Sequence, residues 1–323
     1  MPHAIRFHQT GGPEVLRWEE VAVGDPAPGE VRVRHRAVGV NFIDTYHRGG
    51  LYPLPLPSGL GREGAGVVEA VGAGVADFRP GDRVAYGSSP VGAYSEVRCL
   101  PADRLLKLPE ALGFETGAAM MLKGLTAAYL LLHTYPVRPG DAVLIHAAAG
   151  GVGLIACQWA KALGATVIGT VSTEAKAELA KKHGCDHVIL YTREDVAQRV
   201  REITGEGVAA VYDGVGKDTF MASLDSLRPR GVLATFGNAS GAVPPFDPLL
   251  LSRKGSLFVT RPVLDHYTRT REETEALGAA LFDVVLSGKV KIEIEQTYAL
   301  ADAAQAHRDL EARRTTGSTV LLP

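Results

Sequence analysis

The chain has few cysteines and almost no asparagine. Cys99, Cys157 and Cys185 are odd in number, far apart and without a Cys-x-x-Cys pair, so we expect neither a disulfide framework nor a cysteine metal site. Asparagine occurs only at positions 41 and 238. Because asparagine deamidates when hot, its scarcity favours a thermophilic source, and a GC-rich coding bias is the alternative explanation.

The sequence also lacks an excess of either charge and a long apolar run. Its 34 Lys and Arg against 36 Asp and Glu give a net charge of −2, without the clustered cations that nucleic acid requires. The longest apolar stretch, 143–160, is broken by His146, Gln158 and glycines, and the first residues lack a signal-peptide pattern. We therefore expect a cytoplasmic protein with no membrane span and no nucleic acid as main partner.

The sequence does contain a change of pattern near residue 120. Before it, β-branched runs at 31–40, 64–75 and 82–87 predict a mainly β region. After it, apolar runs alternate with helical segments that end in glycine, which is typical of a doubly wound parallel sheet. The expected strands lie at 142–146, 166–172, 187–191, 209–213, 231–237 and 256–260. The fold class is therefore α/β.

The end of the chain changes pattern once more. A helix is expected at 272–287, a strand near 291–298, a helix at 301–313 and a last strand from 318. We expect this tail to return to the first domain. The expected domains are then residues 1–122 plus 264–323, and residues 123–263.

Two glycine-rich segments compete as the nucleotide-binding loop. Residues 59–64 match Gly-x-Gly-x-x-Gly, but a proline-rich segment precedes them and a strand-like segment follows, so this match is rejected. The segment 148–153 has Ala148 in the first glycine position, yet it follows a buried strand and opens a helix. There Gly150 would let the backbone approach a pyrophosphate, and Gly153 would let the helix pack close to the strand. The expected contacts are Ala149, Gly150, Gly151, Val152 and Gly153.

The choice between NAD and NADP depends on the end of the second strand. An NAD site normally has an acidic residue there, but this chain has Ser172 followed by Thr173, with Lys176 one turn later. Glu174 is expected in the first turn of the next helix, facing its dipole. These residues favour NADPH.

At this point the sequence resembles a known family. The segments AAAGGVGLIACQWAKALGA, GVNFIDTYHRGGLYP, LKGLTAAYLL, VYDGVG and FGNASG together resemble the NADPH:quinone oxidoreductases, the zeta-crystallin-like, zinc-free branch of the medium-chain dehydrogenase/reductase superfamily. The resemblance covers essentially the whole chain. It implies a GroES-like, mainly β catalytic domain into which the Rossmann domain is inserted, and a homodimer formed through the Rossmann domain. It also implies quinone reduction by hydride or electron transfer in a zinc-free cleft between the two domains.

The resemblance also argues against zinc. In zinc-dependent relatives, the positions of Asn41, Arg62 and Lys123 carry Cys, His and Cys, and a tetrahedral catalytic site needs three such donors. We therefore expect no metal, which excludes a zinc alcohol dehydrogenase.

The remaining candidate residues take their roles from the resemblance. Tyr46 and Tyr52, which flank an expected glycine-containing loop at 47–50, are placed in the substrate cleft as hydrogen-bond donors to a quinone oxygen. Asn41 is placed at the nicotinamide, and the alternative is an Asx turn. The other implied cofactor contacts are Lys123, Thr126, Tyr191, Gly216, Phe236, Gly237, Asn238 and Arg313, with Arg314 as an alternative to Arg313.

Two other functions stay open on the sequence alone. One is an NADPH-dependent reductase of alkenals or enones, which would share the cofactor and differ in the acceptor. The other is an NADPH-binding protein with negligible turnover.

Overall fold

The computed structural model describes residues 1–88 and 90–323, and the chain divides into two compact units. The first comprises Met1–Leu125, Tyr267–Leu286 and Ile292–Pro323, and the second comprises Thr126–His266 and Ser287–Lys291. The divisions follow residues 125, 266, 286 and 291, whereas the sequence placed them after 122 and 263 and assigned residues 287–291 to the first domain.

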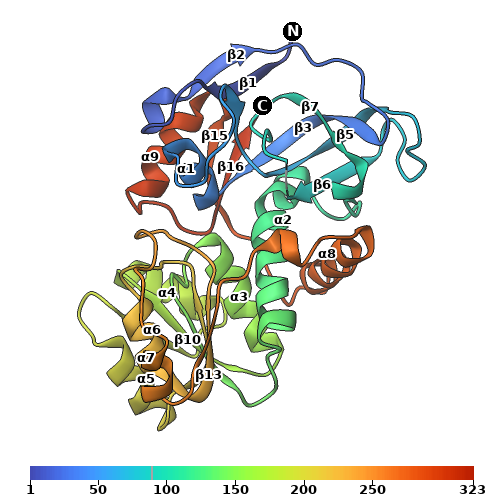
Figure 1. Ribbon diagram of the computed structural model, residues 1–323. Coiled ribbons are helices and arrows are strands. Elements are labelled where there is room, and N and C mark those ends of the chain that lie inside the picture. Colours follow the sequence, from blue (N-terminus) through green and yellow to red (C-terminus); the bar gives the residue numbers. More distant parts are fainter. Residues whose placement is uncertain (89) are drawn as a thin grey trace. The chain divides into compact units, whose positions relative to one another are not determined.

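The first unit is built mainly from β-structure and includes both ends of the chain (Figure 1). Its strands are β1 (His3–Phe7), β2 (Arg17–Glu20), β3 (Glu30–Val40), β4 (Ser58–Gly59), β5 (Glu63–Val71), β6 (Arg83–Gly87), β7 (Val97–Pro101), β8 (Leu106–Lys107), β15 (Ile294–Ala299) and β16 (Ser318–Leu322). Its helices are α1 (Phe42–Gly49), α8 (Arg271–Leu286) and α9 (Ala303–Glu311), while α2 (Phe114–Tyr129) crosses the division.

Strand β3 organises the larger sheet of this unit. The sheet has the order β15-β16-β3-β5-β6-β8, with β7 paired to β3, and a smaller sheet has the order β2-β1-β4. Val31 and Val33 of β3 are buried, whereas the alternate residues Arg32 and Arg34 lie on the other face and pair with Glu69 of β5. The last residues of β3, 37–40, are all buried. The chain therefore enters the core just before Asn41.

The second unit is a six-stranded parallel sheet, as the alternating pattern predicts (Figure 1). Its strands are β9 (Ala142–Ile145), β10 (Thr166–Val171), β11 (His187–Leu190), β12 (Val208–Asp213), β13 (Leu227–Thr235) and β14 (Phe258–Thr260). Its helices are α3 (Gly151–Ala162), α4 (Glu174–Lys182), α5 (Val196–Thr204), α6 (Phe220–Ser226) and α7 (Leu249–Arg253). The strand order β11-β10-β9-β12-β13-β14 reverses between β9 and β12, which is where open parallel sheets bind ligands.

One local expectation is wrong. The glycine-containing loop expected at 47–50 is the end of helix α1, which begins after Asn41 and stops at Gly50. Asn41 and Asp44 form a capping box, and Gly50 ends the helix with a φ of 85°, a left-handed conformation suited to glycine. Eight residues are too few for a helical apolar period to stand out in the sequence. The alternative of an isolated Asx turn at Asn41 is replaced by a helix cap.

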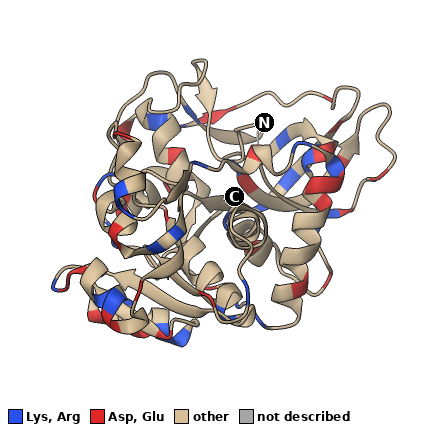
Figure 2. Cartoon of the chain, turned by 60° about the horizontal axis from the view of Figure 1, so that its bottom comes forward, with Lys and Arg blue, Asp and Glu red and all other residues tan. Residues whose placement is uncertain are grey.

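Charged side chains of both signs are interspersed over the ribbon (Figure 2), in keeping with the near-zero net charge. Within the described residues, no helix is long and apolar enough to span a membrane.

Candidate active site and cofactor-binding loop

The glycine turn between β9 and α3 has the tight geometry that the sequence predicts. A Cβ on Gly153 would lie 2.3 Å from the backbone oxygen of Ala147 and 2.7 Å from that of Ala148, so only glycine allows this approach of helix to turn. A Cβ on Gly150 would meet only the Ala147 oxygen, at 3.2 Å. The turn also needs a φ of 53° at Ala147, a left-handed conformation that the sequence did not reveal and that is strained for a residue with a Cβ.

A second loop of the same unit is held by a buried carboxylate. Asp213 ends β12 and is fully buried. Its Oδ1 accepts from the backbone N–H groups of Val215 and Gly216 at 2.8 and 3.0 Å, and its Oδ2 accepts from the hydroxyls of Thr219 and Ser223 at 2.7 and 3.0 Å. Asp213 thus shapes the loop that contains the predicted contact Gly216, and the sequence analysis missed it. A lone acidic residue at the end of an apolar strand was the available signal.

The loop after β13 packs on this one. A Cβ on Gly237 would lie 2.3 Å from the Gly214 oxygen, and one on Gly216 would lie 3.1 Å from the Gly237 oxygen and 3.4 Å from Asn238 Cα. The Phe236 ring lies against Gly214, where an added Cβ would be 3.1 Å away. The structure therefore brings Gly216, Phe236, Gly237 and Asn238 together.

His146 lies beneath these loops, directly after β9. Ser223 donates to Asp213, so its oxygen accepts from His146 Nε2 at 3.0 Å, and His146 Nδ1 in turn accepts from the Thr170 hydroxyl at 2.9 Å. Burial lowers the pKa of His146. A neutral imidazole with both ring nitrogens hydrogen-bonded has a structural role here.

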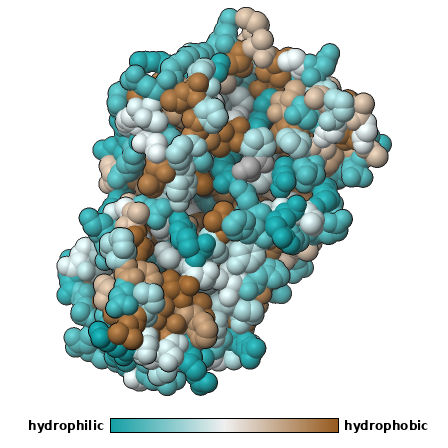
Figure 3. Space-filling model, in the orientation of Figure 1, coloured by the Kyte–Doolittle hydropathy of each residue, from teal (hydrophilic) through white to brown (hydrophobic). Residues whose placement is uncertain are grey.

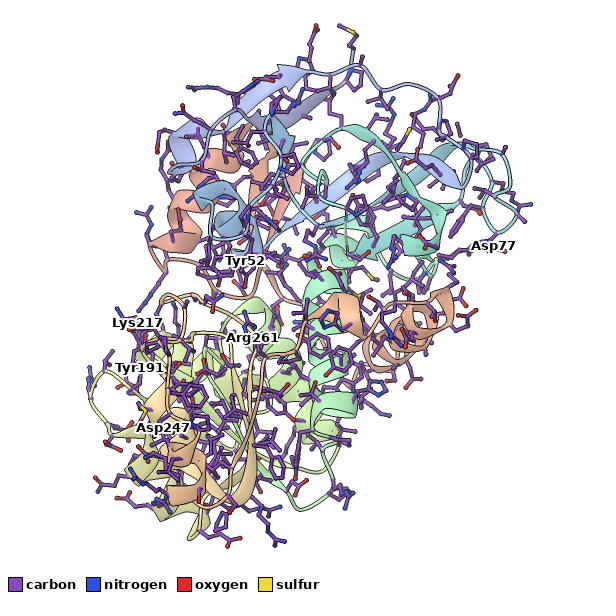
Figure 4. The ribbon with its side chains drawn as sticks, in the orientation of Figure 1. Tyr52, Asp77, Tyr191, Lys217, Asp247 and Arg261 are labelled. Carbon is purple, nitrogen blue, oxygen red and sulfur yellow. The ribbon has the colours of Figure 1, made fainter. Side chains whose placement is uncertain are left out.

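The ends of β10 and β11 carry the residues predicted to select NADPH. Ser172 follows β10, and Tyr191 follows β11 with its N–H donating to the Val171 oxygen at 3.3 Å. Thr173 caps α4 by accepting from the Lys176 N–H at 3.3 Å. Tyr191 is 42% exposed and lies on the surface of this unit (Figure 4). Glu174 is the first residue of α4, as expected, and pairs with the exposed Arg193 at 3.0 Å.

In the first unit, Asn41 and Lys123 converge on one carboxylate. Glu63 Oε2 accepts from Asn41 Nδ2 at 2.8 Å and from Lys123 Nζ at 2.7 Å, and Oε1 accepts from the Leu122 backbone N–H at 2.8 Å. Glu63 is fully buried, Lys123 is 5% exposed and Asn41 is 9% exposed. The sequence predicted Asn41 and Lys123, which are 82 residues apart, but missed the Glu63 that joins them. A carboxylate within the apolar, glycine-rich segment 61–68 was the signal.

A chain of hydrogen bonds runs behind this cluster. Arg48 donates to Gly11 and to His307 Nδ1, so His307 must carry its proton on Nε2, which donates to the Tyr94 hydroxyl at 3.1 Å. Tyr94 then donates to Asp44 Oδ2 at 2.9 Å, which also accepts from the Asn41 N–H. These residues, together with Glu311 on Arg48, were not predicted.

Burial sets the protonation of this chain. It raises the pKa of Asp44 to about 7 and lowers that of His307 to about 3. The pKa of the Tyr94 phenol is raised well above its ordinary value, first by burial and then by Asp44. Asp44 Oδ1 is buried and has no hydrogen-bond partner among the described residues, which suits a carboxyl that is readily protonated.

The two predicted tyrosines pack on each other. The rings of Tyr46, on α1, and Tyr52 meet edge to face with centroids 5.4 Å apart, and both side chains are partly buried. The Tyr52 N–H donates to the Tyr46 backbone oxygen at 3.2 Å, and His47 Nδ1 bonds to the Tyr52 oxygen at 3.1 Å. Tyr52 is labelled in Figure 4.

The remaining predicted residues are placed singly. Thr126 lies on α2, three residues after Lys123, and is 9% exposed. Arg313 is exposed and has a φ of 58° just after α9, whereas its neighbour Arg314 pairs with Asp309.

The donor set around Glu63 does not fit zinc. Zinc sites use thiolate, imidazole and carboxylate donors, whereas Glu63 is here bound by an amide and an ammonium, and Arg62 supplies only a cation. Among residues 1–88 and 90–323, no group of three or more His, Cys, Asp or Glu is placed to hold a metal ion.

Comparison with known proteins first defines the class. The alcohol dehydrogenase GroES-like domain family matches residues 27–110, and the zinc-binding dehydrogenase family matches residues 151–279. The chain thus has the two-part organisation of a medium-chain dehydrogenase/reductase.

Comparison with relatives that match over their full length identifies the family within this class. The chain is 57% identical to a quinone oxidoreductase of Pseudomonas aeruginosa over 325 residues, with all of both chains covered. It is 52% identical to a 2-haloacrylate reductase of a Burkholderia species, covering 100% of this chain and 99% of the relative. A crystal structure of Escherichia coli quinone oxidoreductase complexed with NADPH matches with a TM-score of 0.98 at 53% identity, covering 99% of this chain and 100% of that one. The chain belongs to the zinc-free quinone oxidoreductase family of this superfamily.

Proposed function

We propose that this protein catalyses the NADPH-dependent reduction of quinones. The observation that carries the proposal is the match over the whole chain to quinone oxidoreductases at 53–57% identity. The first unit is then the GroES-like catalytic domain, and the second is the Rossmann domain that binds NADPH.

The second unit has the features that a dinucleotide needs. The turn at Ala149, Gly150, Gly151, Val152 and Gly153 opens the twelve-residue helix α3, whose first N–H groups are available to a pyrophosphate. The end of β10 carries Ser172 and Thr173 in place of an acidic residue, with Lys176 nearby, which favours a cofactor with a 2′-phosphate. We assign Tyr191, and Arg313 of the first unit, to the same phosphate, and Gly216, Phe236, Gly237 and Asn238 to the nicotinamide side.

The first unit supplies polar groups for the reacting ends. NADPH, when bound, supplies the hydride. Asn41 and Lys123 of this unit, together with Thr126, the first residue of the second unit, are the proposed contacts to its nicotinamide half. Tyr46 and Tyr52 are the proposed donors to the quinone oxygens, since a phenol can donate a hydrogen bond and a proton. A quinone accepts hydride without a Lewis acid, so the work of these residues is to position the reactants and exclude water.

The test is NADPH consumption with a panel of quinones and alkenals, after chelator treatment and with NADH in parallel. We expect quinone reduction that survives the chelator and prefers NADPH. If the protein binds NADPH but reduces no acceptor, the proposed function is wrong and the protein is an NADPH-binding protein with negligible turnover.

A reductase of activated double bonds is the second candidate. It is favoured by the 52% identity to a protein that is named for haloacrylate, an alkene conjugated to a carboxylate. Faster turnover of enones or haloacrylates than of any quinone would make this the main activity.

We also propose a homodimer formed through the second unit. In the part of the chain that the structure describes, the edge strand β14 of its sheet pairs with β13 alone, and Phe258 on it is 60% exposed. Met221, Phe246 and Leu249 of the same unit are also exposed, and an apolar area is visible on this unit in Figure 3. A Phe258→Lys variant should be monomeric in analytical ultracentrifugation, while a dimeric variant would place the interface elsewhere.

A cytoplasmic location and a thermophilic source complete the proposal. The second is supported by the two asparagines in 323 residues. A melting temperature in the ordinary mesophile range, about 45–65 °C, would contradict it.

A further inference from the structure

The buried ion pair of Glu63 and Lys123 is not explained by stability alone. Their side chains are 0% and 6% exposed. Removing two charges from water is costly, and replacing such a pair by apolar residues is often neutral or stabilising. A buried pair of this kind can instead fix the position of groups that a reaction uses.

The surrounding structure is fitted to the Glu63 carboxylate. A Cβ on Gly39 would lie 2.2 Å from Glu63 Oε2 and 2.3 Å from the Ala118 backbone oxygen, so the adjacent strand must carry glycine there. The carboxylate accepts from β3–α1 through Asn41 and from α2 through Leu122 and Lys123. The Glu63 side chain on β5 therefore fixes the positions of the β3–α1 junction and of α2.

Lys123 retains donors that Glu63 does not use. An ammonium has three N–H groups, and the hydrogen bond to Glu63 is the one that Nζ makes within the described residues. Two N–H groups of a buried cation are then available to an oxygen of the cofactor or the acceptor. Asn41, whose Nδ2 is engaged by Glu63, has its amide orientation fixed by the same bond.

We propose that Glu63 is a positioning residue of the reaction, which holds the Lys123 ammonium and the Asn41 amide where they meet the nicotinamide and the oxygen of the acceptor. The inference rests on the proposed function, because it takes NADPH and a carbonyl acceptor as the ligands. Glu63 touches neither ligand and acts through Lys123 and Asn41.

The test compares Glu63→Gln with Glu69→Gln. Glu69 lies on the same strand and pairs with Arg34 at 2.5 Å, but its side chain is 26% exposed, so it is a matched loss of a paired carboxylate. The readouts are kcat with a quinone, the Kd of NADPH, and the fluorescence of bound NADPH, which reports how firmly the nicotinamide is held. All are measured at a temperature where both variants give the far-UV spectrum of the folded protein.

We expect kcat of Glu63→Gln to fall by about 100-fold, the cost of a reactant misplaced by roughly 1 Å. The Kd of NADPH should change by less than about 3-fold, because phosphate contacts in the second unit supply most of the affinity. The fluorescence of bound NADPH should also change. Glu69→Gln should keep all three values.

A double-mutant cycle separates positioning from general destabilisation. If Glu63 acts through Lys123 and Asn41, adding Glu63→Gln to a variant that already carries Lys123→Met and Asn41→Ala should lower kcat by less than about 3-fold further. If Glu63→Gln lowers kcat by the same factor in this background as in the wild type, the proposal is overturned. So would a Glu63→Gln variant with unchanged kcat and unchanged fluorescence of bound NADPH.

Failure of the proposed function gives a different result. If the wild-type protein turns over no acceptor, quinone reduction is wrong, but the fluorescence of bound NADPH still decides whether Glu63 fixes the site.

Discussion

Each unit buries a carboxylate at the centre of a polar cluster, and the two carboxylates are compensated in different ways. Within residues 1–88 and 90–323, Asp213 of the second unit accepts from neutral donors alone, two backbone N–H groups and two hydroxyls. Glu63 in the first unit accepts from an ammonium as well as from an amide and an N–H group. Neutral donors fix the shape of a loop, whereas an ion pair keeps a charge that a ligand can meet. We infer that the buried carboxylate of the second unit fixes the backbone of a loop, whereas the buried carboxylate of the first unit keeps a charged group in position for a ligand.

Asp213→Ala should have the largest effect on stability. Four donors, two of them buried and two partly buried, lose their acceptor, so we expect a loss of about 3 kcal/mol in the free energy of unfolding. NADPH binding should weaken by roughly 10-fold, because the Gly216 loop is released. Urea unfolding and a fluorescence titration measure the two effects. The exposed neighbour Asp218→Ala is the control, and equal stability of the two variants would contradict the role given to Asp213.

Arg48→Met tests the charged side of the comparison. It removes the donor to His307 Nδ1 and the partner of Glu311, and we expect a loss of about 2 kcal/mol. Arg34→Met breaks a half-exposed pair with Glu69 and should cost less than about 1 kcal/mol. If the two variants have similar unfolding midpoints, the burial of Arg48 adds nothing to the stability of the protein.

Two glycine substitutions separate the roles of the units. The Cβ added by Gly39→Ala would clash with the Glu63 carboxylate, whereas the Cβ added by Gly153→Ala would clash with the backbone oxygens of Ala147 and Ala148. Each should cost about 2 kcal/mol through overpacking. Gly39→Ala should lower kcat with little change in the Kd of NADPH, and Gly153→Ala should raise that Kd. The reverse pattern in steady-state kinetics and titration would invalidate the division of roles.

The pKa of Asp44 predicts a smaller, pH-dependent effect. Its folded pKa of about 7 lies above the ordinary 3.8, so the folded state binds the extra proton and stability falls as pH rises from about 4 to 7. Asp44→Asn cannot titrate. Relative to the wild type it should gain stability across this range, by at most about 1.4 kcal/mol per pH unit. Histidines are unchanged in this pair of proteins, so the lowered pKa values of His307 and His35 cancel in the difference. A difference that does not vary with pH would contradict the raised pKa.

Glu174→Gln should have the smallest effect. The residue pairs with Arg193 on an exposed surface, so we expect a change below about 0.5 kcal/mol and the same preference for NADPH over NADH. A shift in that preference would show that Glu174 contacts the cofactor.

The sequence predicts the second unit better than the first. Strands such as β9, β10 and β12 are continuous apolar runs, and Gly153 follows one at a fixed spacing, so periodicity and turn chemistry are enough. Helix α1 is too short for such a pattern, and the loop expected there was wrong.

The polar clusters could not be predicted because their members are distant in sequence. Arg48 meets His307 across 259 positions, and Asn41 meets Glu63 across 22. A buried carboxylate can be suspected in an apolar segment, but its partners depend on the register of β3 against β5 and on the placing of α2. The conformation of Ala147 shows the same limit, since the turn imposes it on a residue that does not favour it.

The first unit contains both ends of the chain, and this determines when it can finish folding during synthesis. Its sheet pairs Val40 with Thr319, and its hydrogen-bond chain needs His307. The second unit is complete once residue 291 has been made. On the ribosome, the part made later can therefore fold first. The edge of β3 that pairs with β16 must stay without this partner, and open to wrong partners, until residues 318–322 emerge.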